Sequence, residues 1–222
     1  HLAVCCVVET RFHEKTWQEM PIKKMWDAGL EKCEITTPPK VKGVKNVRNA
    51  EALIEPIEKA ILRAKHGVSV FRDGTIRFDM VDITMTHFRP SEVGMSLKQA
   101  HELGYMVDSV DQVVEIFPQD VVIPENCVED IINVCKFTDA ELKYIYELDT
   151  YYNVETQEDL IGQLIMGIAP HTSGAILGRI IGFTTVKGHY GHPFYHAAKR
   201  RNCDGDIDAI IMLTEGVLNF SR

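Results

Sequence analysis

The chain has 222 residues, of which 45% are hydrophobic and 25% charged, and its formal net charge is −8. The apolar fraction suffices for a buried core and excludes a disordered tail, and the acidic balance argues against a generally basic nucleic-acid binder. No apolar run approaches the roughly 18–20 residues that span a bilayer, so we expect no membrane-spanning helix and no membrane partner. Six cysteines without a CxxC pair predict reduced, mostly buried thiols in an intracellular protein.

The first half of the chain predicts short helices and one hairpin. A strand, two helices and an exposed linker are expected at 2–8, 21–30, 56–66 and 36–45. Asp73-Gly74 lies between two β-rich arms, and because this dipeptide accepts the positive φ angles of a tight turn, we predict a hairpin over 68–79. Ser96 and Gln99 form a capping-box pattern, which predicts the start of another helix.

The second half predicts further helices followed by strands. The predicted helices lie at 125–137, 138–148 and 156–166, and the predicted strands at 113–123, 174–183 and 209–213. Thr138 and Glu141 form a second capping-box pattern. A change in charge and pattern divides the chain into an N-terminal segment, an acidic α+β region and a β-rich region, at 1–40, 41–154 and 155–222. Because the chain begins on His1 and ends at Arg222 within a helical pattern, we expect a piece of a longer protein.

Residues 160–203 form a window of 44 residues that contains no acid. The window holds five basic residues, of which Lys199, Arg200 and Arg201 are consecutive, and four histidines. Such a window predicts a local positive potential, suited to phosphate groups, on an otherwise acidic protein. A buried apolar segment explains the absence of acids in the first part of the window, but not the basic residues of the second part.

The sequence that follows these basic residues is Asn202-Cys203-Asp204-Gly205-Asp206. Asp204 and Asp206 are two positions apart, so in an extended or turning backbone both carboxylates project to the same side. Gly205 permits a tight bend between them, and Asn202 adds a neutral oxygen ligand. Oxygen ligands suit Mg²⁺ or Mn²⁺, and the basic flank suits a polyphosphate or a nucleic-acid backbone. The motif therefore predicts metal-dependent phosphoryl transfer.

A calcium-binding loop is one alternative for the same stretch, and a solvated acidic loop without a ligand is another. Asp204, Asp206 and Asp208 occupy the first, third and fifth positions of a calcium-loop pattern, and Glu215 occupies the twelfth. Ala209, however, stands at the sixth position, where the bend demands glycine. A strand at 209–213 would exclude this alternative.

Three histidines upstream have a spacing that suggests zinc, HxxHxxxH, at His189, His192 and His196. Pro193 follows the second of them, and no acidic partner is near in the sequence. We therefore predict phosphate contacts or structural hydrogen bonds for these side chains, and no zinc site in this piece.

Several long strings around the carboxylate motif resemble the large subunit of the archaeal family-D DNA polymerases. They are APHTSGAILGRIIGF, HAAKRRNCDGD and LNFSR, at 169–183, 196–206 and 218–222. The likeness extends back through 58–90 and covers most of the chain from about residue 55 onward. One departure is Ile207, where the family usually has an acid, which leaves a third carboxylate ligand in doubt.

The resemblance implies an α+β fold in which a helical and hairpin N-terminal part precedes part of a double-psi β-barrel catalytic core. It assigns the barrel portion to 155–222, with further strands expected from beyond Arg222 or from elsewhere in the subunit. It also implies that Asn202, Asp204 and Asp206 bind catalytic magnesium, with Asp204 and Asp206 as catalytic residues. Lys199, Arg200 and Arg201 are then expected near nucleotide or primer phosphates.

The function implied is DNA-directed DNA polymerase activity in replication, in which a deoxynucleotide is transferred from dNTP to a primer 3′-hydroxyl. The implied partners are primer–template DNA, dNTP, a small exonuclease subunit that forms a heterodimer with the large subunit, and a sliding clamp. The implied location is the cytoplasm, at the nucleoid, and we expect the isolated piece to be inactive. The alternative function is a non-catalytic nucleic-acid-binding or assembly module of a larger complex.

Overall fold

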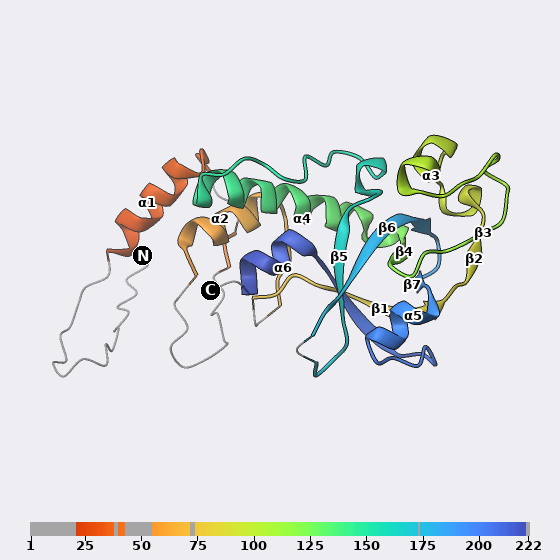
Figure 1. Ribbon diagram of the computed structural model, residues 1–222. Coiled ribbons are helices and arrows are strands. Elements are labelled where there is room, and N and C mark those ends of the chain that lie inside the picture. The colour runs from red at the N-terminus through yellow and green to blue at the C-terminus, as the bar shows by residue number, and fades with distance from the viewer. Residues whose placement is uncertain (1–20, 38–39, 43–54, 72–73, 173, 221–222) are drawn as a thin grey trace.

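The computed structural model describes residues 21–37, 40–42, 55–71, 74–172 and 174–220 (Figure 1). The strand predicted at 2–8 and part of the linker predicted at 36–45 lie outside the described residues. The α-helices are α1 (Ile22–Lys32), α2 (Ile57–Lys65), α3 (Leu97–Leu103), α4 (Val128–Glu141), α5 (Pro193–Ala198) and α6 (Leu213–Phe220). The strands are β1 (Phe78–Thr84), β2 (His87–Phe88), β3 (Val114–Glu115), β4 (Asp120–Pro124), β5 (Leu164–Ile168), β6 (Ile176–Thr184), β7 (Gly188–Gly191) and β8 (Ile207–Met212).

Six of the strands form a closed barrel in the order β1-β7-β4-β6-β5-β8. The neighbours β1/β7 and β4/β6 are parallel, and the other four pairs are antiparallel. The α+β class and the β-barrel are therefore confirmed. Because β1 and β4 precede residue 155, however, the barrel is not confined to 155–222. The barrel closes among the described residues, and the strands that complete it, β1 and β4, come from an earlier part of the chain and not from beyond Arg222.

Helices cover the barrel at its two ends. Figure 1 shows α1, α2, α4 and α6 gathered at one end, with α3 and the small β2–β3 sheet at the other. The larger apolar core joins the barrel to α2 and α4 through side chains such as Ile61, Phe137 and Ile210. A second core lies beneath α3 and includes Tyr105 and Ile181. Burial of these two clusters provides the main driving force for folding.

Local sequence signals place several elements correctly. The helices predicted at 21–30 and 56–66 are α1 and α2. The capping box is present at the start of α3, where the Ser96 hydroxyl accepts from the Gln99 backbone N–H and the Gln99 side chain accepts from the Ser96 backbone N–H. In the described part of the hairpin predicted at 68–79, the Phe71 backbone N–H donates to the Thr75 carbonyl at 2.9 Å, and no strand is assigned before Phe78.

Two predicted helices differ from the structure, because Thr138 does not begin a new helix and most of the helix predicted at 156–166 is replaced by a turn and a strand. Thr138 lies inside α4, fully buried, and its hydroxyl donates to the Val134 carbonyl one turn earlier, so α4 continues through it and passes into a π-helical turn, η3 (Leu142–Tyr146). Around Thr156 the chain forms only the short 3₁₀ turn η4 (Glu158–Leu160) before it becomes β5. Pairing of β5 with both β6 and β8 in the barrel overrides the local helical pattern.

The helices among the described residues include none with the length and apolarity needed to cross a membrane.

A buried polar cluster attaches α6 to α2 and α4. The Lys59 ammonium lies 2.9 Å from Glu141 Oε1 and donates to Asn219 Oδ1 at 2.8 Å, while the Asn219 amide donates to Glu215 Oε1. Glu215 and Glu141 are each 1% exposed. Burial raises the pKa of Glu215 to about 8, with the charges of Lys59 and Arg63 opposing the shift and that of Glu141 adding to it. Glu215 is therefore protonated in the folded protein at neutral pH.

We expect the protein to lose stability as the pH rises from about 4.5 to 8. In this interval the unfolded chain releases the Glu215 proton that the folded chain retains, so the folded state binds more protons and a higher pH favours unfolding. Glu215→Gln carries no ionisable proton and should remove this part of the pH dependence. Between about pH 4.5 and pH 8 the free energy of unfolding of the wild type should fall by a few kcal/mol more than that of Glu215→Gln, a magnitude set by the size of the pKa shift.

Thermal unfolding at a series of pH values measures this effect. Glu102→Gln, which changes an exposed glutamate on α3, serves as the control and should follow the wild-type curve. Parallel pH profiles for the wild type and Glu215→Gln would contradict the prediction.

Candidate metal and phosphate site

The predicted metal ligands lie on a loop between α5 and β8. Asn202 and Asp204 are exposed and Asp206 is half-buried, while the Cys203 side chain between the first two is also half-buried. Arg200, Cys203 and Gly205 adopt positive φ angles of 62°, 58° and 107°. Two of the three are not glycine, so tertiary contacts hold this loop in a conformation that side chains disfavour. The loop thus exposes Asn202 and Asp204 to solvent on a constrained backbone.

The three basic residues before the loop have different environments. Arg200 is exposed. The Arg201 guanidinium lies over the end of the loop, with Nε 2.7 Å from Asp208 Oδ1 and 3.5 Å from Asp206 Oδ2, and it donates to the Ile207 carbonyl at 3.0 Å. The Lys199 side chain is 0% exposed. Of the three predicted phosphate contacts, Arg200 is the most accessible to an anion, whereas Lys199 faces the protein interior.

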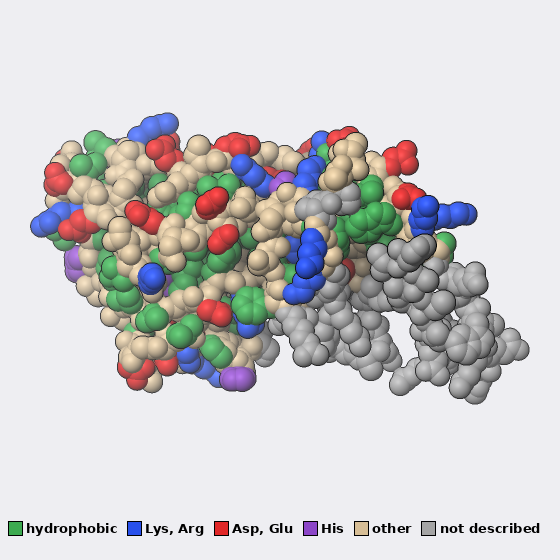
Figure 2. Space-filling model, turned by 180° about the vertical axis from the view of Figure 1, so that it is seen from behind, with side chains coloured by type: hydrophobic (Ala, Val, Ile, Leu, Met, Phe, Trp, Pro, Cys, Tyr) green, Lys and Arg blue, Asp and Glu red, His purple; other side chains and the backbone are tan. Residues whose placement is uncertain are grey.

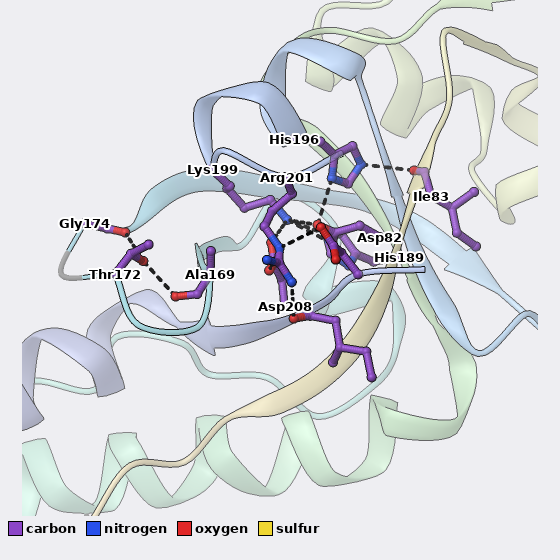
Figure 3. A network of polar contacts seen from close by, with 12 residues as sticks. Asp82, Ile83, Ala169, Thr172, Gly174, His189, His196, Lys199, Arg201 and Asp208 are labelled. Carbon is purple, nitrogen blue, oxygen red and sulfur yellow. Dashed lines mark hydrogen bonds and ion pairs between the residues drawn. The ribbon is translucent and has the colours of Figure 1, made fainter. Parts of the chain in front are cut away.

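A buried network surrounds Lys199, as Figure 3 shows. Its ammonium lies 3.0 Å from both carboxylate oxygens of Asp82 on β1 and 2.6 Å from Asp208 Oδ2 on β8. His189 on β7 contacts the same two partners, with Nε2 3.1 Å from Asp82 Oδ1 and 3.3 Å from the Lys199 ammonium. The side chains of Asp82, His189, Lys199 and Asp208 are all 0% exposed. Charged groups are that deeply buried only when they neutralise one another.

The charges in this network shift the pKa values of its members. Burial alone would raise the pKa of Asp82, but the neighbouring His196 and Asp208 side chains and the positive charge of Lys199 hold it well below its usual range. Burial and the positive charge of Lys199 lower the pKa of His189 to about 3, so this imidazole is neutral at physiological pH. Asp82 and Lys199 therefore form an ion pair beside a neutral histidine.

The short helix α5 positions three members of this region. Pro193 occupies its first turn, and His192 caps it by accepting the Phe194 backbone N–H at Nδ1, 3.1 Å away. His196 and Lys199 then face the barrel. The His196 Nε2–H donates to the Ile83 carbonyl at 3.0 Å, which leaves Nδ1 facing Asp82 Oδ2 at 3.4 Å. His189 and His196 thus both contact Asp82, whereas His192 caps α5.

A glycine on β5 leaves space for side chains that α5 directs toward the barrel. A Cβ atom at Gly167 would collide with the Tyr195 hydroxyl and would lie 3.0 Å from the Lys199 side chain. Tyr195 is 2% exposed, and its ring faces the Lys199 ammonium at 4.9 Å. The absence of a side chain at this strand position therefore allows Lys199 to reach Asp82 and Asp208.

Asp82, His196 and Cys203 offer ligand atoms that lie within 4.8 Å of one another, the closest grouping of potential metal-binding side chains in the described part of the chain. Both Asp82 oxygens already contact the Lys199 ammonium, so a positive charge is present at this position. The predicted ligands Asn202, Asp204 and Asp206 are not part of this group. The calcium-loop alternative is excluded, because β8 runs through Ala209 and the following residues.

Sequence reasoning missed Asp82, although its pattern contains a signal. Met80 and Asp82 are two positions apart on β1, so their side chains lie on the same face of the strand, and both are buried. An acid therefore occupies the apolar face of this strand. An acid at such a position needs a buried cation, and Lys199 provides it from 117 residues away. The sequence separation hides the pair from any local pattern.

Acids from outside the acid-free window neutralise much of its positive charge. Arg179 on β6 makes a two-point contact with Asp120 on β4, with Nε–Oδ1 at 2.7 Å and Nη2–Oδ2 at 2.8 Å. Lys199 and Arg201 are paired as described above. On the face seen in Figure 2, acidic and basic side chains of the described residues alternate and form no broad basic patch.

Comparisons with known proteins give matches over most of the chain. A family model described as "DNA polymerase II large subunit DP2, catalytic domain" matches residues 34–222. The DNA polymerase II large subunit of Picrophilus torridus is 51% identical over 201 residues, which cover 90% of this chain and 18% of the relative. The corresponding subunit of Thermoplasma volcanium is 54% identical over 180 residues, which cover 81% of this chain and 16% of the relative. For that of Methanocorpusculum labreanum the identity is 49% over 191 residues, with 83% and 17% covered. The chain thus spans less than a fifth of the length of these relatives.

Proposed function

Because the chain belongs to the DNA polymerase II large subunit family, we propose that it forms part of a catalytic core that adds deoxynucleotides to a primer 3′-hydroxyl during DNA replication. The observation that carries the proposal is the exposed loop of Asn202, Asp204 and Asp206 on a chain that matches the catalytic domain of this family. In the reaction the primer oxygen bonds to the α-phosphorus of dNTP, pyrophosphate leaves, and the hydroxyl proton is released.

The donor chemistry of the loop fits a divalent cation. Two carboxylates and one amide oxygen, at Asp204, Asp206 and Asn202, are the hard oxygen ligands that Mg²⁺ prefers and Mn²⁺ accepts, and none of the three is fully buried. Bound there, the ion would lower the pKa of the primer hydroxyl and offset negative charge on the α-phosphate. In this proposal Asp204 and Asp206 are the catalytic carboxylates.

The basic residues contribute in different ways under this proposal. Arg200 is exposed beside the loop and has the charge and reach to contact a nucleotide or primer phosphate. Arg201 neutralises Asp206 and Asp208 and orients the end of the loop, and it remains 20% exposed for a second contact. Lys199 acts from the interior, through the carboxylates that it contacts.

The barrel and the partners complete the proposal. The parallel pairs β1/β7 and β4/β6 within an otherwise antiparallel six-stranded barrel support the double-psi type. Primer–template DNA and dNTP are the proposed substrates. A small exonuclease subunit and a sliding clamp are the proposed protein partners, and a replicative role puts the complex on chromosomal DNA in the cytoplasm. The proposed activity belongs to the complete polymerase, of which this chain is a part.

Binding and extension assays with the complete polymerase test the proposal. With a labelled primer–template, a polymerase should extend the primer only when dNTP and Mg²⁺ or Mn²⁺ are present, and chelation should stop extension. A non-catalytic binding module would bind DNA with an affinity that falls steeply with salt but is indifferent to the divalent cation and to Asp204. That second result would overturn the proposed function.

A further inference from the structure

We propose that the buried network of Asp82, Lys199 and Asp208 positions the loop of residues 200–206, and that the network thereby sets the affinity of this loop for divalent cations. The inference rests on the proposed function, since it concerns the same loop. It assigns to Asp82 and Lys199 a positioning role from within the barrel wall, without contact to the substrate.

The Lys199 ammonium joins the two ends of the loop. Lys199 directly precedes the loop and Asp208 follows it, and the Lys199 ammonium lies 2.6 Å from Asp208 Oδ2. The same ammonium contacts both oxygens of Asp82 at 3.0 Å, which attaches this closure to β1. The two ends of the loop are therefore held together and held against the barrel by a single side chain.

The backbone of Asp82 also holds the loop. The Asp82 N–H donates to the Asp206 carbonyl at 3.0 Å, next to the register in which Val81 pairs with Ile207. Above this bond Arg201 contacts the carboxylates of both Asp206 and Asp208. The position of Asp206 thus depends on Asp82 of β1 and on Arg201 near the start of the loop. Figure 3 shows these two residues close to each other.

Loss of a carboxylate partner of Lys199 is energetically costly. An ammonium shared by two carboxylates that are all 0% exposed has no water to replace a lost partner. Removal of the negative charge of Asp82 leaves Lys199 bound to Asp208 alone, and the ammonium is then free to shift toward the loop. Outer partners that orient the ligands of a metal typically change its affinity by about 10- to 100-fold when they are replaced.

The barrel offers a matched control. Asp120 on β4 is also 0% exposed and also makes a two-point contact with a cation, Arg179. This pair connects β4 to β6, and its side-chain polar contacts in the described structure are with Tyr105 and Leu103, not with residues 200–206. Asp82→Asn and Asp120→Asn therefore remove the same charge from equally buried carboxylates in one barrel, but only the ion pair of Asp82 reaches the loop.

The experiment compares these variants in the complete polymerase. Mn²⁺ binding is measured by electron paramagnetic resonance, and the Mg²⁺ concentration for half-maximal primer extension is measured in parallel. We expect Asp82→Asn to weaken Mn²⁺ binding and to raise the Mg²⁺ requirement by about tenfold or more. Asp120→Asn should lower the melting temperature by a comparable amount and leave both metal values unchanged. Equal metal values for Asp82→Asn and the wild type would overturn the proposal, as would equal changes in the two variants.

Two further variants keep the outcome decisive. If Asp82→Asn does not fold, Asp208→Asn removes the other carboxylate of Lys199 and should produce the same metal phenotype; a wild-type phenotype in that variant overturns the proposal. Asp204→Ala reports separately on the proposed function. If Asp204→Ala abolishes extension while Asp82→Asn behaves as the wild type, the polymerase function stands and the positioning role falls.

Discussion

Alanine at Asp204 or Asp206 in the complete polymerase is expected to lower the rate of nucleotide incorporation by about 1,000-fold or more, the scale typical of groups that stabilise charge in phosphoryl transfer. Each substitution removes one of two carboxylates that the proposed site offers to a divalent cation. Asn202→Ala removes a neutral ligand and should cause a smaller loss. Primer extension with rapid quenching measures the rate.

Stability should change little in these variants. Asp204 is exposed, and Asp206 is half-buried with its nearest cation, Arg201, 3.5 Å away, so each carboxylate contributes at most about 1 kcal/mol to folding. The matched control is Asp79→Ala, which removes an exposed acid from β1 and should leave incorporation unchanged. Incorporation at the wild-type rate by either Asp204→Ala or Asp206→Ala would remove the catalytic assignment.

Lys199→Met is expected to destabilise the protein by roughly 3–5 kcal/mol, the usual cost of leaving a buried charge without its partner. Methionine has a similar length but no charge, so Asp82 and Asp208 would face each other in the interior without the ammonium between them. Arg201 still contacts Asp208, whereas Asp82 keeps only imidazole partners. Urea unfolding measures the loss.

Two controls isolate the origin of this loss. Lys187→Met changes an exposed lysine in the same acid-free window and should shift the unfolding free energy by no more than about 0.5 kcal/mol. In a second control, Asp82→Asn is combined with Lys199→Met, and the double variant should be more stable than the sum of the two single effects predicts. Strict additivity, or a loss below about 1 kcal/mol for Lys199→Met, would contradict a buried ion network.

Local chemistry in the sequence was sufficient for several features. Ser96 and Gln99 predict the start of α3, because a capping box involves neighbours only three residues apart. The strands β6 and β8 follow from apolar β-branched runs, and long strings such as HAAKRRNCDGD predict the family that the match over residues 34–222 confirms. The loop with Asn202, Asp204 and Asp206 is likewise evident from residue type and spacing, and its ligand role stays a prediction.

Only the tertiary structure decided how distant segments combine. The strand β5 lies where the local pattern favours a helix, because pairing with β6 and β8 outweighs intrinsic propensity. The barrel closes with β1 and β4, which precede the predicted boundary, since strand pairing does not depend on sequence distance. Asp82 and Lys199 are 117 residues apart and meet in the interior, where low polarity makes each charge require the other. Because of that requirement, Lys199, which the sequence places near phosphates, lies buried between the carboxylates of Asp82 and Asp208.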